Sequence, residues 1–427
     1  MELRLGYKQT EVGVIPEDWA APRLDSLGAG TVPAIKAGPF GSSLTKDQYV
    51  VEGFKVYGQE QVIRGDHTYG DYFISAKKYR ELESCAVRPG DVLLSLVGTT
   101  GKLLEVPDDA PLGVINPRLL RLSFDRSKVL PKFFKYQFES DTVQLRLSRH
   151  AQGGTMGVLN AGALRPFQIP LPPLAEQRAI AAALSDVDAL LGGLDRLIAK
   201  KRDLKQAAMQ QLLTGQTRLP GFDGEWEVKR LGDHVTFLKN GVNSRAELTQ
   251  GGHIKYLHYG DVHACTGVSL APHSLPSIPS EKATTLDRLN DGDLIFADAS
   301  EDVAGVSKSV EIRDVGSTEL VSGLHTIAAR FDKHVLADGF KAYLQFCALF
   351  TDHLRRLAAG TKVFATNRAH IASVEMRLPS VDEQAAIARV FDDMNAEIDA
   401  LEARLHKTRA LKQAMMQELL TGRTRLV

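Results

Sequence analysis

Hydrophobic residues recur along two segments of the chain at alternating intervals of three and four positions. This spacing is typical of a helix with one narrow apolar seam. We expect each helix to contain about 40 residues, which is a length of about 60 Å. The predicted coiled-coil seam consists of Ile180, Leu184, Val187, Leu191, Leu194 and Ile198 in the first segment and Ile387, Phe391, Met394, Ile398, Leu401 and Leu405 in the second.

The two segments are copies of each other. The stretch LKQAAMQQLLTGQTRL (Leu204–Leu219) returns 207 positions later as LKQAMMQELLTGRTRL (Leu411–Leu426). At this offset residues 171–219 align with residues 378–426 without a gap, and about half of the positions are identical. The repeat therefore predicts two equivalent helices.

Both copies carry signals for helix ends. Ser380 precedes Glu383 by the capping-box spacing, which predicts reciprocal bonds between each side chain and the other residue's backbone N–H. The first copy has Pro173 instead, which a first helical turn accepts. Gly215 and Gly422 end the two patterns, where glycine can adopt the left-handed conformation of a C-terminal cap.

A long helix with one apolar stripe needs a partner. The narrow seam favours pairing of the two copies, and packing of each seam on its neighbouring domain is the alternative. Two equivalent helices in tandem are most simply related by a pseudo-two-fold axis, which makes them antiparallel. The predicted fold class is α+β: two mixed α/β domains separated by two long helices in an antiparallel intramolecular coiled coil. The predicted divisions are residues 1–170 (N-terminal segment and first domain), 171–219 (first helix), 220–377 (second domain) and 378–427 (second helix).

The two domains resemble each other only faintly. Trp19 aligns with Trp226, and Asn160 aligns with Asn367 just before each helix. Both domains contain a Gly-Asp turn followed by an apolar strand, in RPGDVLLSLVG and NDGDLIFADAS. Short β-rich stretches separated by Gly and Asp predict mixed domains with mainly antiparallel strands.

Composition narrows the class of protein. The chain has 427 residues, 44% hydrophobic and 24% charged, which is typical of globular domains. Its three cysteines lie far apart, which excludes a disulfide framework, and it contains no long apolar run, so we expect a cytoplasmic protein. The net charge is zero, but residues 20–170 carry +4 and residues 222–378 carry −3 with nine of the twelve histidines.

The candidate catalytic motifs do not match the residue patterns that their chemistry requires. GTTGKLL (Gly98–Leu104) lacks the four residues that a phosphate-binding loop places before Gly-Lys, and INPRLL (Ile115–Leu120) is interpreted as an ordinary loop. His258, His263 and Cys265 have no second ligand cluster, so we expect no metal. From the sequence we therefore expect that the chain is not an enzyme.

Polar loops in both domains combine glycines with side chains that reach the phosphates and base edges of nucleic acid. Each loop alone is more often an ordinary surface loop. Their joint occurrence in two domains favours DNA binding. The candidate DNA-binding residues are Ser42, Ser43, Lys46, Gln59, Arg64, Lys78 and Thr155 in the first domain and Asn240, Asn243, Arg245, His258, Lys362 and Arg368 in the second.

Several phrases resemble the specificity subunit of type I restriction-modification systems: GYKQTEVGVIPEDW, KAGPFGSSL, PLPPLAEQ and the repeated LKQ…LLTG. The resemblance covers nearly the whole chain. It implies two target-recognition domains that each read one part of a split, asymmetric DNA site. It also implies that two modification subunits dock on the helices and methylate adenine, and that restriction subunits join to cleave. S-adenosylmethionine, ATP and Mg²⁺ would then bind to the partner subunits and none of them to this chain.

Two other classes of protein remain as alternatives. A coiled-coil scaffold would use its end domains to bind proteins rather than DNA. A self-contained nuclease or methyltransferase would carry a diverged active site and turn over DNA alone.

Overall fold

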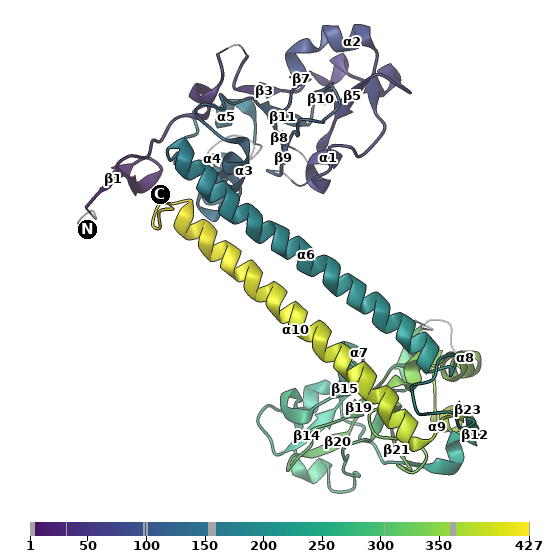
Figure 1. The fold of residues 1–427 in the computed structure, drawn as a ribbon. Helices are drawn as coiled ribbons and strands as arrows, with labels where there is room; N and C mark the ends of the chain where they lie inside the picture. Colours follow the sequence, from purple (N-terminus) through teal and green to yellow (C-terminus); the bar gives the residue numbers. More distant parts are fainter. Residues whose placement is uncertain are drawn as a thin grey trace. The chain divides into compact units, whose positions relative to one another are not determined.

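The computed structural model describes residues 5–30, 32–96, 99, 101–152, 159–302, 304–358 and 364–426. The chain divides into two compact units, one formed by residues 1–195 with 403–427 and the other by residues 196–402. Each unit holds one mixed domain, part of helix α6 (Leu174–Leu212) and part of helix α10 (Val381–Leu419). Both helices have 39 residues, close to the predicted length (Figure 1). The predicted divisions at residues 170, 219 and 377 stay predictions, since the two units divide within the helices.

In the first unit, α6 and α10 pack against each other in opposite directions. Asp188 of α6 pairs with Lys412 at 2.7 Å, and Asp195, further along α6, pairs with Arg409, which precedes Lys412. Partner numbers fall along α10 as they rise along α6, so the pair is antiparallel. Both helices also contribute to the core of the first domain, through Ile180, Ala181, Leu184, Met416 and Leu419, and Leu420 directly after α10 adds to it.

The second unit repeats this arrangement. Arg202 pairs with Glu402 at 2.6 Å, and the ammonium of Lys205, further along α6, donates to Asn395. These contacts confirm the predicted antiparallel pairing of the helix copies. The helices join the core of the second domain through Leu212, Ile387, Ala388 and Phe391, and Leu213 directly after α6 adds to it.

The positions predicted for the seam are shielded from solvent to different extents. Eight are buried: Ile180, Leu184, Leu194, Ile198, Ile387, Phe391, Ile398 and Leu405. The other four are partly buried: Val187, Leu191, Met394 and Leu401.

The helix ends follow the sequence signals with one difference. Gly215 and Gly422 have φ angles of 70° and 71°, which confirms the left-handed caps. Ser380 Oγ accepts a hydrogen bond from the Glu383 N–H at 3.3 Å, as a capping box requires. The Glu383 carboxylate, however, pairs with Arg218 at 2.6 Å, so the reciprocal half of the predicted box is wrong. A charged guanidinium that donates two parallel hydrogen bonds is a stronger partner for a buried carboxylate than a neutral backbone N–H.

The first domain contains a five-stranded sheet, β4-β6-β5-β10-β7, a four-stranded sheet, β3-β11-β8-β9, and a β1-β2 hairpin. Among its described strand pairs only β5 and β10 are parallel. Its strands are β1 Tyr7–Thr10, β2 Gly13–Pro16, β3 Ile35–Ala37, β4 Tyr49–Val50, β5 Phe54–Tyr57, β6 Phe73–Ile74, β7 Ala86–Val87, β8 Val92–Ser95, β9 Leu103–Glu105, β10 Gly113–Ile115 and β11 Leu119–Leu122, and its helices are α1 Gln59–Arg64, α2 Ala76–Glu81, α3 Pro131–Glu139, α4 Asp141–Gln152 and α5 Ala161–Leu164.

The second domain has sheets of order β13-β21-β17-β19-β15 and β16-β14-β20, with the short pairs β12-β23 and β18-β22. Here β14 runs parallel to β20 and β15 runs parallel to β19. Its strands are β12 Glu227–Arg230, β13 Val235–Phe237, β14 Ile254–Leu257, β15 Ser269–Leu270, β16 Ser277–Ile278, β17 Leu294–Ala297, β18 Ala299–Ser300, β19 Ser309–Ile312, β20 Glu319–Ser322, β21 Thr326–Phe331, β22 Phe364–Ala365 and β23 Glu375–Leu378, and its helices are α7 Tyr259–Ala264, α8 Ala348–Leu357 and α9 Arg368–Ala372.

The joint between domain and helix is the same in both units. The Gln177 side chain donates to the carbonyls of Lys128 and Pro172 and accepts from the Leu130 N–H, each at 2.9 Å. Gln384, 207 positions later, makes the same three bonds to residues 335, 379 and 337. Because a buried backbone group without a partner is costly, this glutamine fixes where the helix enters the domain.

A tyrosine also occupies equal positions in the two units. The Tyr136 hydroxyl donates to Asp188 at 2.7 Å, and the Tyr343 hydroxyl donates to Asp392 at 3.2 Å. Burial is the main cause that raises the pKa of both tyrosines, so both hydroxyls remain donors at neutral pH. The frames that hold the two domains on the helices are therefore duplicated.

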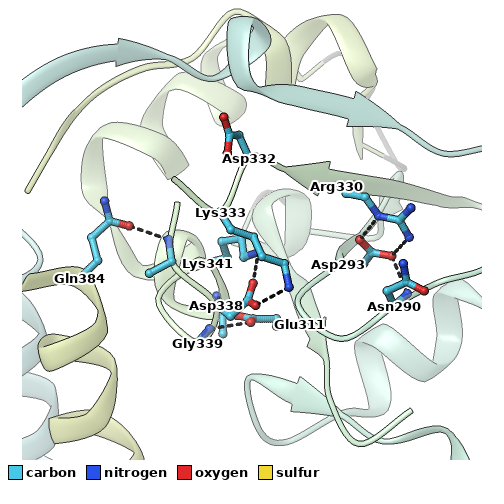
Figure 2. Close-up of polar contacts among 12 residues, drawn as sticks. Asn290, Asp293, Glu311, Arg330, Asp332, Lys333, Asp338, Gly339, Lys341 and Gln384 are labelled. Carbon is cyan, nitrogen blue, oxygen red and sulfur yellow. Dashed lines mark hydrogen bonds and ion pairs between the residues drawn. The ribbon is translucent and has the colours of Figure 1, made fainter. Parts of the chain in front are cut away.

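Two buried carboxylates, Asp293 and Glu311, reinforce the frame of the second domain (Figure 2). The Arg330 guanidinium donates two hydrogen bonds to the Asp293 carboxylate, at 2.8 and 2.7 Å. The same carboxylate accepts a hydrogen bond from the Asn290 N–H. Glu311 is buried and accepts from the Gly339 N–H at 2.6 Å, and burial raises the pKa of its carboxyl group. These bonds join β21 to the start of β17 and join β19 to the segment that follows β21.

Candidate nucleic-acid interface

In the first domain, three loops meet at one edge of the sheets. Strands β5 and β10 are parallel, so the loops after both begin at the same edge, and the Asn116 N–H bonds the Tyr57 carbonyl at 2.8 Å. The loop after β3 passes next to Asn116. Gly38 in this loop lies so close that an added Cβ atom would collide with the Asn116 carbonyl. We call residues 38–43, 58–61 and 116–118 the first loop surface.

The second domain builds the equivalent edge from β14 and β20. The Gly323 N–H bonds the Leu257 carbonyl at 2.8 Å, just as Asn116 bonds Tyr57. The loop after β13 joins them, since the Asn240 amide donates to the Gly323 carbonyl at 3.3 Å. We call residues 240–245, 258–263 and 323–325 the second loop surface.

Some predicted DNA-binding residues of the first domain lie on the first loop surface. Ser42 is exposed and Ser43 is half-buried on the turn Gly41–Ser43, and Gln59 begins α1. The Gln59 Oε1 atom is buried and has no hydrogen-bond partner among the described residues. Arg64 ends α1, with its guanidinium 4.0 Å from the centre of the Tyr69 ring.

Other predicted residues of this domain are placed elsewhere. Ile74 of β6 pairs with both Tyr49 and Phe54, so the segments next to it lie at the opposite end of β5 from the first loop surface. Lys46, just before β4, and Lys78, on α2 after β6, belong to those segments. Lys78 pairs there with Glu81 at 3.1 Å. Thr155 lies outside the described residues.

The predicted residues of the second domain mostly bond to each other and to loop backbone. Arg368 donates to the Leu238 carbonyl at 2.7 Å and to the Asn240 side chain at 3.2 Å. Arg245 pairs with Asp261 at 2.6 Å. The Asn243 amide donates to Glu247, and His258 is the buried N-terminal cap of α7. Lys362 lies outside the described residues.

Sequence reasoning missed the third loop of each surface. Arg118 is exposed beside Asn116, in the INPRLL stretch interpreted as an ordinary loop. His325 is exposed in the corresponding loop of the second domain. The repeat offset of 207 relates these two positions, and this signal was available in the sequence.

Electrostatics differ between the loops of the second surface. Burial, followed by the nearby Arg245 charge, lowers the pKa of His258, and its Nδ1 accepts from the Gly260 N–H at 3.3 Å. Lys282 is the main cause that lowers the pKa of Glu247 to about 2, with help from Asn243. At neutral pH the imidazole of His258 is therefore neutral, and the carboxylate of Glu247, next to the second loop surface, is ionised.

The neutral imidazole predicts a pH dependence of stability. The pKa of His258 in the folded chain lies below the ordinary value of 6.5, so the unfolded chain binds the proton more readily. Its contribution to stability is complete above pH 6.5 and is lost as the pH falls below it. We expect urea unfolding of the second unit at pH 5.5 and 7.5 to differ less in His258→Asn, which keeps a capping side chain, than in the native chain. An equal pH difference in both proteins would contradict this role.

The three side chains considered as metal ligands are engaged elsewhere. The His263 ring contacts the Ala299 carbonyl at 3.1 Å, and the Cys265 thiol donates to the Ser269 carbonyl at 3.4 Å. No group of three His, Cys, Asp or Glu side chains that could hold a metal occurs among the described residues. Among the same residues, no helix is long and apolar enough to span a membrane.

The fold and the two loop surfaces define a class of protein in which two domains are joined to paired helices in the same way but carry different loops. Residues 32–199 match the family model of the type I restriction modification DNA specificity domain. The chain is similar to type I restriction-modification specificity subunits over nearly its whole length, which confirms the predicted resemblance.

Curated relatives support this family across most of the chain. The putative MjaX specificity subunit of Methanocaldococcus jannaschii is 22% identical and covers 98% of this chain and 97% of its own length. The EcoKI specificity subunit of Escherichia coli is 22% identical over 79% of this chain and 75% of its own length. Members of this family recognise DNA for a larger complex and are not its catalytic subunits.

Solved structures share the fold. The HsdS subunit of Thermoanaerobacter tengcongensis superposes with a TM-score of 0.55 at 18% identity, over 96% of this chain and 98% of that one. A chain from a study of complex assembly in a type I restriction-modification system gives a TM-score of 0.57 at 19% identity, over 96% and 99%.

Proposed function

We propose that the first and second loop surfaces each bind one half of a split, asymmetric DNA site. One observation supports this proposal above the others: Gln177 and Gln384 join the two domains to their helices by the same three bonds, whereas the loops that the domains hold carry different side chains. Equal frames with unlike loops suit two different base sequences bound in the same way. Serine, arginine, asparagine and histidine on these loops are side chains that contact phosphates and base edges.

The duplicated helices would dock two copies of a modification subunit. Support comes from equal features at the C-terminal ends of the two helices: the Thr214 hydroxyl donates to the Gln210 carbonyl and the Thr421 hydroxyl to the Gln417 carbonyl, both at 2.6 Å. Equivalent surfaces can bind two copies of one partner. In this proposal S-adenosylmethionine, ATP and Mg²⁺ bind to modification and restriction subunits, this chain binds none of them, and the complex works in the cytoplasm.

Exchange of one domain tests the proposal. Residues 19–168 would be replaced by the same region of another family member, and the chimera would be expressed with modification subunits. We expect mapping of methylated adenines to show one new half-site and one unchanged half-site, because the second loop surface is untouched. The reciprocal exchange of residues 226–375 is the matched control and should change only the other half. A chimera that leaves both halves unchanged would refute the assignment of the domains.

Salt dependence separates DNA binding from a protein scaffold. A complex that contacts several phosphates loses affinity for random DNA steeply as salt rises, because counterions are released on binding. Weak binding with no salt dependence would favour the scaffold.

A further inference from the structure

Arg118 and His325 occupy the same position in the two domains. In the first domain Leu119 of β11 pairs with Ser95, the last residue of β8. In the second domain Thr326 of β21 pairs with Ala297, the last residue of β17. Arg118 and His325 directly precede Leu119 and Thr326, so the strand register, independently of sequence similarity, makes them equivalent.

Arg118 lies on the first loop surface with its guanidinium available to a ligand. Its backbone N–H bonds the Asn116 side chain at 2.9 Å, which fixes the turn, and the residue is exposed. No ion pair joins it to a carboxylate among the described residues. An arginine fork matches the O6 and N7 acceptors of guanine in the major groove.

His325 is held in an uncommon conformation. Its φ angle is 57°, which costs a non-glycine residue roughly 1 kcal/mol or more. Asp298 holds it from two sides: the Asp298 N–H bonds the His325 carbonyl at 3.1 Å, and the carboxylate bonds the ring Nδ1, also at 3.1 Å. The Tyr259 ring meets the imidazole edge-on, with 5.6 Å between the ring centres. The side chain nevertheless remains 53% exposed.

The bond to Asp298 selects the chemistry that His325 can offer. An ionised carboxylate only accepts, so in the neutral ring the hydrogen lies on Nδ1 and Nε2 carries a lone pair. No hydrogen bond to Nε2 occurs among the described residues. A neutral His325 therefore presents one acceptor.

We propose that Arg118 and His325 are equivalent specificity-determining residues, Arg118 for guanine and His325 for a base that offers an amino group, adenine N6 or cytosine N4. This inference rests on the proposed function of the two loop surfaces. The two domains would then use one structural position to read opposite hydrogen-bond patterns, an acceptor pair in one half-site and a donor in the other.

The experiment compares four variants of the chain, each assembled with modification subunits, by the sequences that they methylate. Arg118→Ala should relax guanine preference at one position of one half-site by about tenfold, since a bidentate base contact is worth about 1–3 kcal/mol. His325→Ala should relax one position of the other half-site only. The matched controls are substitutions of exposed residues, Arg126→Ala, beyond the other end of β11, and His273→Ala, in the turn Pro272–Ser274, and neither should alter the methylated sequence.

Asp298→Asn tests the hydrogen-bond pattern itself. The asparagine amide can donate to Nδ1, which allows the ring to carry its hydrogen on Nε2 and to donate to the base. We expect this variant to accept guanine or thymine at the affected position, whereas His325→Ala should lose preference there altogether. A merely structural role for Asp298 would lower methylation at every sequence equally.

The outcomes separate this inference from the proposed function. If domain exchange changes one half-site but Arg118→Ala and His325→Ala leave base preference unchanged, the loop surfaces bind DNA and this inference is wrong. A uniform loss of affinity in Arg118→Ala at all sequences would mark a phosphate contact and also overturn it. If domain exchange changes neither half-site, the proposed function itself fails.

Discussion

Replacing Arg425 by alanine is expected to lower the free energy of unfolding of the first unit by about 3 kcal/mol. The Glu176 carboxylate is fully buried and is bonded by the Arg425 guanidinium at 2.6 and 2.8 Å and by the Trp19 indole N–H at 2.9 Å. The same guanidinium is the main cause that lowers the pKa of Asp18. Without Arg425 a buried charge would keep one neutral donor. Urea denaturation followed by circular dichroism measures the loss.

The matched control for this variant is Arg423→Ala. Arg423 is 68% exposed and lies 3.8 Å from Glu418, so its removal should change stability by less than about 0.5 kcal/mol. Adding Glu176→Gln to the Arg425 variant should restore part of the lost stability, because the buried charge is gone. Native stability in Arg425→Ala alone would contradict the role of this ion pair.

A chain that ends at Ser380 is expected to lose cooperative folding in both units. It lacks α10 and the residues after it, which contribute Met416, Leu419 and Leu420 to the first core and Ile387 and Phe391 to the second. Each buried side chain of this size contributes about 1.5–3 kcal/mol, so the total approaches the whole stability of a typical domain. Differential scanning calorimetry should show no sharp transition.

A second truncation, after Gly422, provides the control. It keeps the whole of α10 and removes Arg425, so it should unfold cooperatively with the reduced stability of Arg425→Ala. A normal transition in the chain that ends at Ser380 would show that the domains fold without α10, and the account of the shared cores would be wrong.

The repeat in the sequence predicted much of the frame. The copies at offset 207 anticipated the two 39-residue helices, the left-handed glycines Gly215 and Gly422 and the antiparallel pairing. They did not reveal what Gln177 and Gln384 bond, because those partners are backbone groups far away in the chain. The capping box at Ser380 was half wrong for the same reason, since Arg218 approaches Glu383 from 165 positions away.

The loop surfaces were predicted less completely. Polar residues after β3 and β13 and at the starts of α1 and α7 were identified from loop composition. Lys46 and Lys78 had the same composition, but the strand order places them at the other end of β5. Arg118 and His325 were overlooked, since a single arginine or histidine in a short loop carries no local signal.

The sequence by itself determined two equivalent helices, their C-terminal glycine caps and the tandem organisation, because apolar periodicity and glycine conformation are local properties of each segment. Only the tertiary structure decided which loops meet, because that depends on strand direction: β5 runs parallel to β10 and β14 runs parallel to β20. This choice of direction brings Asn116 to Tyr57 and Gly323 to Leu257, and it places Arg118 and His325 among residues far from them in the chain.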